Sequence, residues 1–164
     1  MAVTIARDGY AQVEQNHLSA PRTGQVYAQL PAKEGITKLE QGQYVHYDYA
    51  AGNVNFDGAG PWMMVVNEEK LYDERHQMHK DFAQLVEDSY TGKIVPRVFV
   101  MQVGDIYTTN AVAPGSYTVG DELKIGTDGF PMVGDAAAGD PCLKVVAETV
   151  MPDMQPAVKL QVIA

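Results

Sequence analysis

Alternation of apolar and polar residues runs through much of this chain, and it is the feature that most restricts the possible folds. A period of two places successive side chains on opposite faces of a strand, so each alternating stretch predicts a half-buried β-strand. Two further stretches, 62–66 and 98–101, are apolar at successive positions, which is typical of central strands buried on both faces. The alternating stretches are 25–30, 44–49, 123–125, 143–148 and 158–162.

Turn signals separate these predicted strands. Asp-Gly pairs occur at 57–58 and 128–129, a Pro-Gly pair at 114–115, and the stretch 138–141 joins Gly to Asp and Pro. Seven or more short strands with such punctuation are typical of all-β domains. We therefore predict a mainly β fold, either a small β-barrel or a β-sandwich.

The segment near 68–90 departs from the period of two. Asn67 is a suitable helix cap and Thr91-Gly92 a suitable end, so the pattern predicts one helix that covers a mouth or face of the sheet. Because a charged residue interrupts the apolar stripe, a long irregular connection stays an alternative. The residues at helical spacing are Leu71, Arg75, Met78, Phe82 and Leu85.

The first 25 residues are polar and aperiodic, apart from a short strand-like stretch at 3–5, and they end in a turn at 19–24. We predict an extended N-terminal arm over residues 1–25, followed by a single β domain over residues 26–164. A frayed terminus is the alternative for the arm.

The charge balance narrows the choice of partners. The chain has 12 Lys and Arg against 21 Asp and Glu, a formal net charge of −9 over 164 residues. A surface of that sign repels phosphate, so we expect no nucleic acid and no anionic membrane as partners. The N-terminus lacks the pattern of a cleaved secretion signal, and no apolar run approaches the ~18 residues of a membrane span. We expect a soluble protein made in a cytosol.

Candidate catalytic and metal-binding residues are few. His76 and His79 share a face if their segment is helical, but zinc needs three or four ligands and this pair supplies two. Cys142 is the only cysteine and has no activating neighbour. Asp135 and Asp140 lie in predicted turns and leave calcium as a minor alternative. No nucleophile or nucleotide-binding motif occurs, so we expect no enzyme, no cofactor and no bound metal.

Aromatic residues gather around two predicted strands. Tyr44, Tyr47 and Tyr49 lie within one of them, and Trp62 begins what we expect to be its neighbour. Cross-strand packing explains such a cluster, but tyrosine and tryptophan are also enriched at interfaces. We expect two of the four to pack inside the domain and two to contact a partner, and the pattern leaves open which.

These features together resemble a known class of proteins. A polar N-terminal segment precedes an acidic β domain with a Gly-Asp turn in 119–125, a Gly-rich stretch at 133–140 and a closing alternating strand at 157–163. In this pattern the chain resembles the head decoration, or cement, proteins of tailed bacteriophages. The stretch 42–82 is also similar to structural head proteins of such phages. The resemblance covers about two thirds of the chain.

The resemblance implies a structural virion protein that binds the outside of the assembled phage capsid and staples neighbouring major capsid proteins. It implies the capsid exterior as the location and the bacterial host cytoplasm as the place of synthesis. The partners would be the phage major capsid protein and, in a homo-oligomer such as a trimer, further copies of the chain. The capsid-contact candidates are Val3, Ile5, Tyr10, Tyr44, Tyr47 and Trp62.

Two other classes stay open. A carbohydrate- or host-surface-binding β module would use the tyrosine and tryptophan cluster as its platform. A small metal-dependent enzyme, which the ligand count disfavours, would use His76 and His79.

Overall fold

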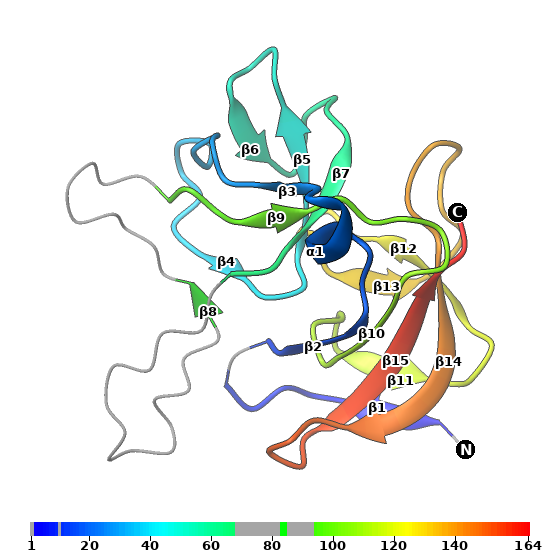
Figure 1. Ribbon diagram of the computed structural model, residues 1–164. Coiled ribbons are helices and arrows are strands. Elements are labelled where there is room, and N and C mark those ends of the chain that lie inside the picture. Colours follow the sequence, from blue (N-terminus) through cyan, green and yellow to red (C-terminus); the bar gives the residue numbers. More distant parts are fainter. Residues whose placement is uncertain (1, 10, 68–82, 85–93) are drawn as a thin grey trace.

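A computed structural model of the chain describes residues 2–9, 11–67, 83–84 and 94–164. Antiparallel strands dominate this part of the chain, together with one short helix, α1 (Ala20–Thr23) (Figure 1). The predicted mainly β class is therefore confirmed. The sheets are not closed into a barrel, so the β-sandwich is the architecture that the structure fits.

The larger sheet has six strands, and every neighbouring pair is antiparallel. Its longest hairpin joins β14 to β15 and carries a register shift between Val145 and Ala147, the mark of a β-bulge. Across the sheet the order is β13 (Pro131–Val133), β12 (Glu122–Ile125), β14 (Leu143–Val150), β15 (Pro156–Val162), β10 (Ile106–Thr109) and β2 (Val13–His17).

The second sheet has five strands, in the order β3 (Val26–Tyr27), β9 (Val98–Phe99), β7 (Trp62–Val65), β5 (Tyr44–Asp48) and β6 (Asn53–Asn55). The two stretches with successive apolar residues form β7 and β9, and both strands lie in the interior of this sheet. The prediction of central strands buried on both faces is thus confirmed for them.

Two small sheets complete the described strands. β1 (Val3–Ile5) pairs with β11 (Gly115–Tyr117), and β4 (Leu39–Glu40) pairs with β8 (Ala83–Gln84). The helix or long connection predicted near 68–90 falls outside the described residues, apart from the two residues of β8.

Two large apolar clusters make up most of the core, and a small third cluster consists of Ala11, Ala111 and Phe130. The main cluster lies between the two large sheets and takes Tyr44 and Met64 from the five-stranded sheet. The second cluster takes their strand neighbours Val45 and Met63, because successive side chains of a strand point to opposite faces. The five-stranded sheet is therefore covered on both faces, by the other sheet on one side and by connecting segments on the other.

The first 25 residues supply the strands β1 and β2 and the helix α1, and they do not form an arm separate from the domain. β1 and β2 are strands of the sheets, and Ile5, Leu18 and Ala20 belong to the main core cluster. Asp105 anchors the same segment, since its Oδ1 accepts from Ser19 N at 3.0 Å and from Ser19 Oγ at 2.5 Å. The division at residue 25 is corrected accordingly, because the segment supplies both ladder hydrogen bonds and buried apolar area.

Candidate functional site

The structure places most of the sequence-predicted contact residues inside the domain. Ile5, Tyr44 and Tyr47 are each at most 1% exposed, so they have no surface to offer a partner. Their assignment as capsid contacts is corrected for this reason. Val3 and Trp62 are partly exposed, and Tyr10 lies outside the described residues.

Tyr44 is buried because it completes a hydrogen bond between the two sheets. Its hydroxyl, on β5, lies 3.0 Å from the hydroxyl of Tyr107 on β10, and both residues are fully buried. Burial raises the pKa of both phenols well above the usual value, because a phenolate here would lose its hydration. The pair therefore stays neutral at physiological pH and serves packing rather than proton transfer.

Trp62 is fixed by polar and aromatic contacts. Its indole N–H donates to Asp140 Oδ1 at 2.9 Å, which ties the loop after β13 to the five-stranded sheet. The ring of His46 stacks on the indole with centroids 3.7 Å apart. His46 Nδ1 lies 2.7 Å from the carbonyl oxygen of Gly60, and because a carbonyl only accepts, Nδ1 carries the proton. Trp62 is thus held in place by Asp140 and His46.

A second aromatic group reaches the surface beside the β5–β6 turn. Tyr49 is 63% exposed and its ring meets that of Tyr47 edge-on, with centroids 5.2 Å apart. The ring of Tyr27 also packs against Tyr47, with centroids 5.7 Å apart. The Tyr47 hydroxyl donates to Gln29 Oε1 at 3.1 Å, so Tyr47 is a buried support and Tyr49 is the ring available for contact. Of the four clustered aromatics, Tyr44 and Tyr47 are those that pack inside the domain.

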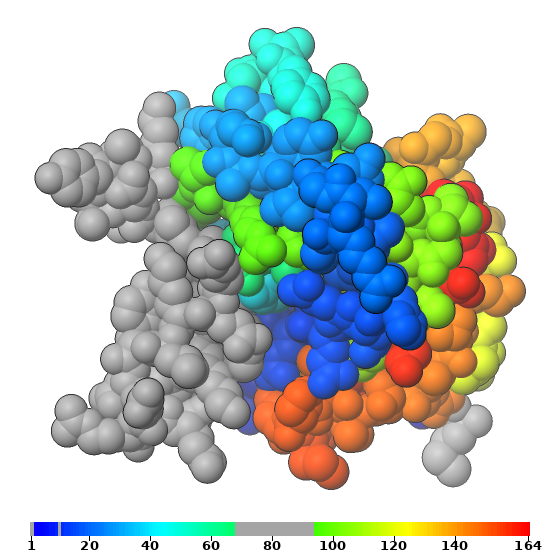
Figure 2. Space-filling view, viewed as in Figure 1, coloured from blue at the N-terminus to red at the C-terminus, as the bar shows by residue number. Residues whose placement is uncertain are grey.

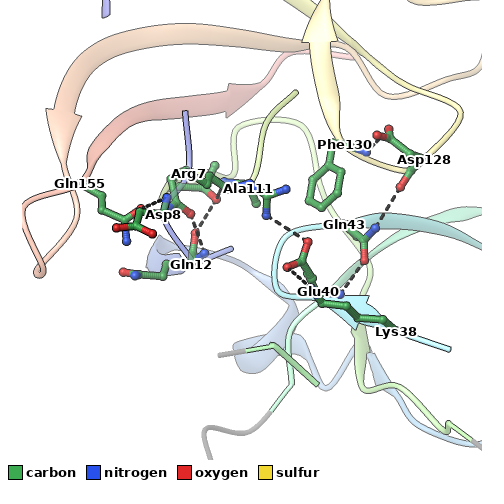
Figure 3. A network of polar contacts seen from close by, with 12 residues as sticks. Arg7, Asp8, Gln12, Lys38, Glu40, Gln43, Ala111, Asp128, Phe130 and Gln155 are labelled. Carbon is green, nitrogen blue, oxygen red and sulfur yellow. Dashed lines mark hydrogen bonds and ion pairs between the residues drawn. The ribbon is translucent and has the colours of Figure 1, made fainter. Parts of the chain in front are cut away.

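A polar network holds the segment after β1 against the domain (Figure 3). Arg7 donates to Glu40 Oε2 at 3.0 Å and its guanidinium lies over the ring of Phe130, 4.4 Å from the centroid. Lys38 Nζ lies 2.8 Å from the other oxygen of Glu40. Burial alone raises the pKa of Glu40, but the hydrogen bond from Lys38 and the charge of Arg7 outweigh it, so that its pKa lies below the ordinary value.

The same network continues to the turn between β14 and β15. The backbone N–H of Asp8 donates to Gln155 Oε1 at 2.9 Å, and Gln12 Nε2 donates to Asp153 Oδ2 at 2.5 Å. Burial alone raises the pKa of Asp153, but the hydrogen bonds from Gln12 and Gln155 outweigh burial, so its pKa lies below the ordinary value. The carboxylate therefore stays ionised at neutral pH. The turn is therefore attached to the N-terminal segment as well as to its own strands.

This turn carries exposed apolar side chains that the sequence analysis did not single out. Met154, in the turn, is 74% exposed, and Val150, the last residue of β14 before the turn, is 46% exposed. A signal was present in the sequence, because Pro152 and Pro156 bound a short turn in which Met154 follows an Asp. The alternation pattern could not predict the exposure of these residues, because it describes strands and gives no information on a turn.

In the described part of the chain, the metal-ligating residue types do not form a cluster large enough for a metal site. No group of three or more His, Cys, Asp or Glu side chains there is arranged to hold a metal ion. His76 and His79 lie outside the described residues. Burial and the nearby charges of Glu122 and Asp135 raise the pKa of the Cys142 thiol, the opposite of what activates a nucleophile.

Comparison with protein families, with curated proteins and with solved structures finds no match for this chain. Among the described residues, no helix is long and apolar enough to cross a membrane. The fold and the surface together define a small β-sandwich domain whose exposed apolar residues include turn residues at hairpin ends.

Proposed function

We propose that this chain is a structural virion protein that binds the outside of an assembled tailed-phage head and holds neighbouring major capsid proteins together. The observation that supports this proposal is the placement of exposed apolar side chains at opposite ends of one body. Tyr49 follows β5 at the top of Figure 1, and Met154 lies in the β14–β15 turn at the bottom. A body with a contact at each end can bridge two neighbours.

The physical basis of stapling is linkage. A ligand that binds the assembled shell and not the free subunits stabilises the shell by mass action. The stabilisation grows with the number of bound copies, because a subunit released from one bridge is still held next to it by the others and binds again. The net charge of −9 suits a position outside the shell, away from packaged DNA, since like charges repel.

Contacts with further copies of the chain belong to the same proposal. β2 is the last strand of the six-stranded sheet among the described residues, and Gln15, Asn16 and His17 on it are exposed. A strand at the edge of a sheet offers backbone groups for pairing with another chain. A homo-oligomer, a trimer among the possible forms, would use such an edge.

The test is a binding assay with heads that lack this protein. Heads are purified from a phage in which the gene is deleted, mixed with the purified chain and sedimented. We expect the chain to co-sediment with heads, to saturate, and to raise the temperature at which heads release DNA. Unassembled major capsid protein is the control and should bind far less. Failure to co-sediment with heads contradicts the proposal.

A carbohydrate- or host-surface-binding module is the second candidate, and Tyr49 is the observation that favours it. An exposed ring that packs edge-on against the buried ring of Tyr47 is what a sugar face stacks on. A glycan array with wild type and Tyr49→Ala separates the two candidates. Glycan binding that Tyr49→Ala abolishes supports the module, and absence of glycan binding leaves the virion proposal.

A further inference from the structure

Three lysines lie in one line across the outer face of the six-stranded sheet. The strand neighbours of Lys124, Lys144 and Lys159 belong to the main core cluster, so these three side chains leave the opposite face. Lys144 is opposite Glu122 on β12 and Gln161 on β15. Lys124 is two residues from Glu122, and Lys159 is two residues from Gln161 in the other direction along the strands. Each is therefore a diagonal neighbour of Lys144, at about 7–8 Å, and this lysine row spans about 15 Å.

The lysine row is accessible from solvent. All three residues are half-buried, and the side chain of Lys144 is 43% exposed. The stem of Lys124 lies against Gly134, where an added Cβ would meet Lys124 Cε at 3.1 Å. Figure 2 shows orange and red segments, the colours of β14 and β15, at the surface on the lower right of the molecule. The stems thus pack on the sheet, and the charged ends are carried by regular strands.

The charge of the lysine row is not neutralised by the chain itself. The chain has 21 Asp and Glu against 12 Lys and Arg, so a carboxylate partner for each lysine is the expectation. Lys33 and Lys38 meet it, since each lies 2.8 Å from a carboxylate oxygen. In the part of the chain that the structure describes, Lys124 and Lys159 form no ion pair, and the third member of the row lies 4.0 Å from Glu122. The row therefore leaves positive charge free for a partner.

The spacing of the lysine row fits an extended acidic segment. Side chains on one side of an extended chain repeat about every 6.6–6.8 Å, close to the diagonal spacing of the row. Asp or Glu at alternate positions of a short stretch thus faces all three lysines. Nucleic acid fits less well, because its charge continues past the row, where Glu122, Glu14 and the net charge of −9 repel it. A short acidic segment of a protein ends within the row.

We propose that the lysine row binds an extended acidic segment of the phage major capsid protein on the outside of the head. This inference rests on the proposed function and names the chemistry of one contact. Complementary charge orients a protein as it approaches its partner. The face with unpaired lysines is then the one that an acidic chain turns toward an acidic segment of the shell.

The test compares two double variants with the same change in net charge. Lys124→Gln with Lys159→Gln removes the two lysines without an ion pair. Arg22→Gln with Lys33→Gln is the control, because Arg22 lies in α1 and Lys33 pairs with Asp57, both outside the six-stranded sheet. Lys124→Arg with Lys159→Arg keeps the charge and serves as the rescue. Each protein is mixed with purified heads that lack this chain, and binding is measured by sedimentation at about 0.05 M and about 0.5 M NaCl.

The variants should differ in head binding and not in folding. At low salt we expect the Gln variant of the row to bind about threefold to thirtyfold more weakly than wild type, the loss of two exposed ion pairs. The control and the Arg variant should bind like wild type. High salt should weaken wild-type binding more than binding of the Gln variant. Urea midpoints of all four proteins should agree, which shows that each variant is folded.

Each contrary outcome has a distinct meaning. Heads that bind the Gln variant as tightly as wild type overturn the lysine row and leave the proposed function intact. Equal weakening in the control also overturns it, because net charge and not this face then decides binding. Wild type that does not bind heads overturns the proposed function and the row with it. Binding of a labelled single-stranded oligonucleotide that only the Gln variant loses, with head binding unchanged, overturns the inference in favour of nucleic acid.

Discussion

The buried hydroxyl pair of Tyr44 and Tyr107 provides a sharp test of how the two sheets are held together. The two oxygens are 3.0 Å apart and both residues are 0% exposed. Replacing either tyrosine by Phe leaves the other hydroxyl buried without this partner. We expect Tyr44→Phe and Tyr107→Phe each to lower the free energy of unfolding by about 1–3 kcal/mol. For a domain of this size that lowers Tm by about 2–4 °C per kcal/mol.

The double variant separates the hydrogen bond from simple packing. When both hydroxyls are replaced, no polar group is left unpaired and the rings still fill the same volume. We therefore expect Tyr44→Phe with Tyr107→Phe to be no less stable than either single variant, with a coupling energy of about 1–3 kcal/mol between the two positions. Urea unfolding followed by fluorescence at neutral pH measures all four proteins of the cycle.

Tyr49→Phe is the control, because its hydroxyl belongs to a ring that is 63% exposed and its loss leaves nothing buried. We expect its stability to lie within about 0.5 kcal/mol of wild type. Additive losses in the double variant would refute the reasoning, since they would mean that the two hydroxyls act independently. Single variants as stable as wild type would refute it as well.

Four further predictions concern the segments that hold the sandwich together. Ile5→Ala should lower the free energy of unfolding by about 2–5 kcal/mol, because Ile5 is 1% exposed in the main core, and deletion of residues 1–25 should abolish cooperative urea unfolding. Glu40→Gln should lower the free energy of unfolding at neutral pH, and the loss should shrink as the pH falls through the lowered pKa of Glu40. The reason is that a carboxyl group with a lowered pKa stabilises the fold only while it is ionised. Urea unfolding of both proteins between pH 7 and pH 3 measures this difference. Gly60→Ala should destabilise by at least about 1–3 kcal/mol in the same assay, since the added Cβ would clash with the backbone carbonyl oxygen of Tyr47.

The alternation of the sequence was a good guide where one face of a strand is apolar. It did not predict β10, where Thr108 and Thr109 are polar but are buried in the sheet. Their hydroxyls donate to Asn16 Oδ1 at 2.7 Å and to the backbone oxygen of Gln12 at 2.6 Å. Because β2 pairs with β10 and supplies these acceptors, the two threonine hydroxyls are hydrogen-bonded although they are buried. A polar residue pattern therefore did not mean that the strand is exposed.

The N-terminal segment was misjudged for the same reason. Its polar residues indicated an arm outside the domain, but they are the partners of the polar residues on β10 and in the β14–β15 turn. Sequence patterns describe each stretch alone, whereas these bonds join positions far apart in the chain. The assignment of Tyr44 and Tyr47 as contact residues was wrong for a related reason. The pattern did not reveal that the two side chains lie in two different core clusters, one on each face of the sheet.

The burial of the N-terminal segment also bears on how the chain would bind a shell under the proposed function. A free arm of 25 residues that orders on the shell would lose about 1–2 kcal/mol of conformational entropy per residue, or roughly 25–50 kcal/mol in all. In the folded domain this ordering is complete before the partner arrives. Binding then opposes only the loss of rigid-body motion and of surface side-chain freedom, so a few preformed apolar contacts at hairpin ends suffice when many copies act together.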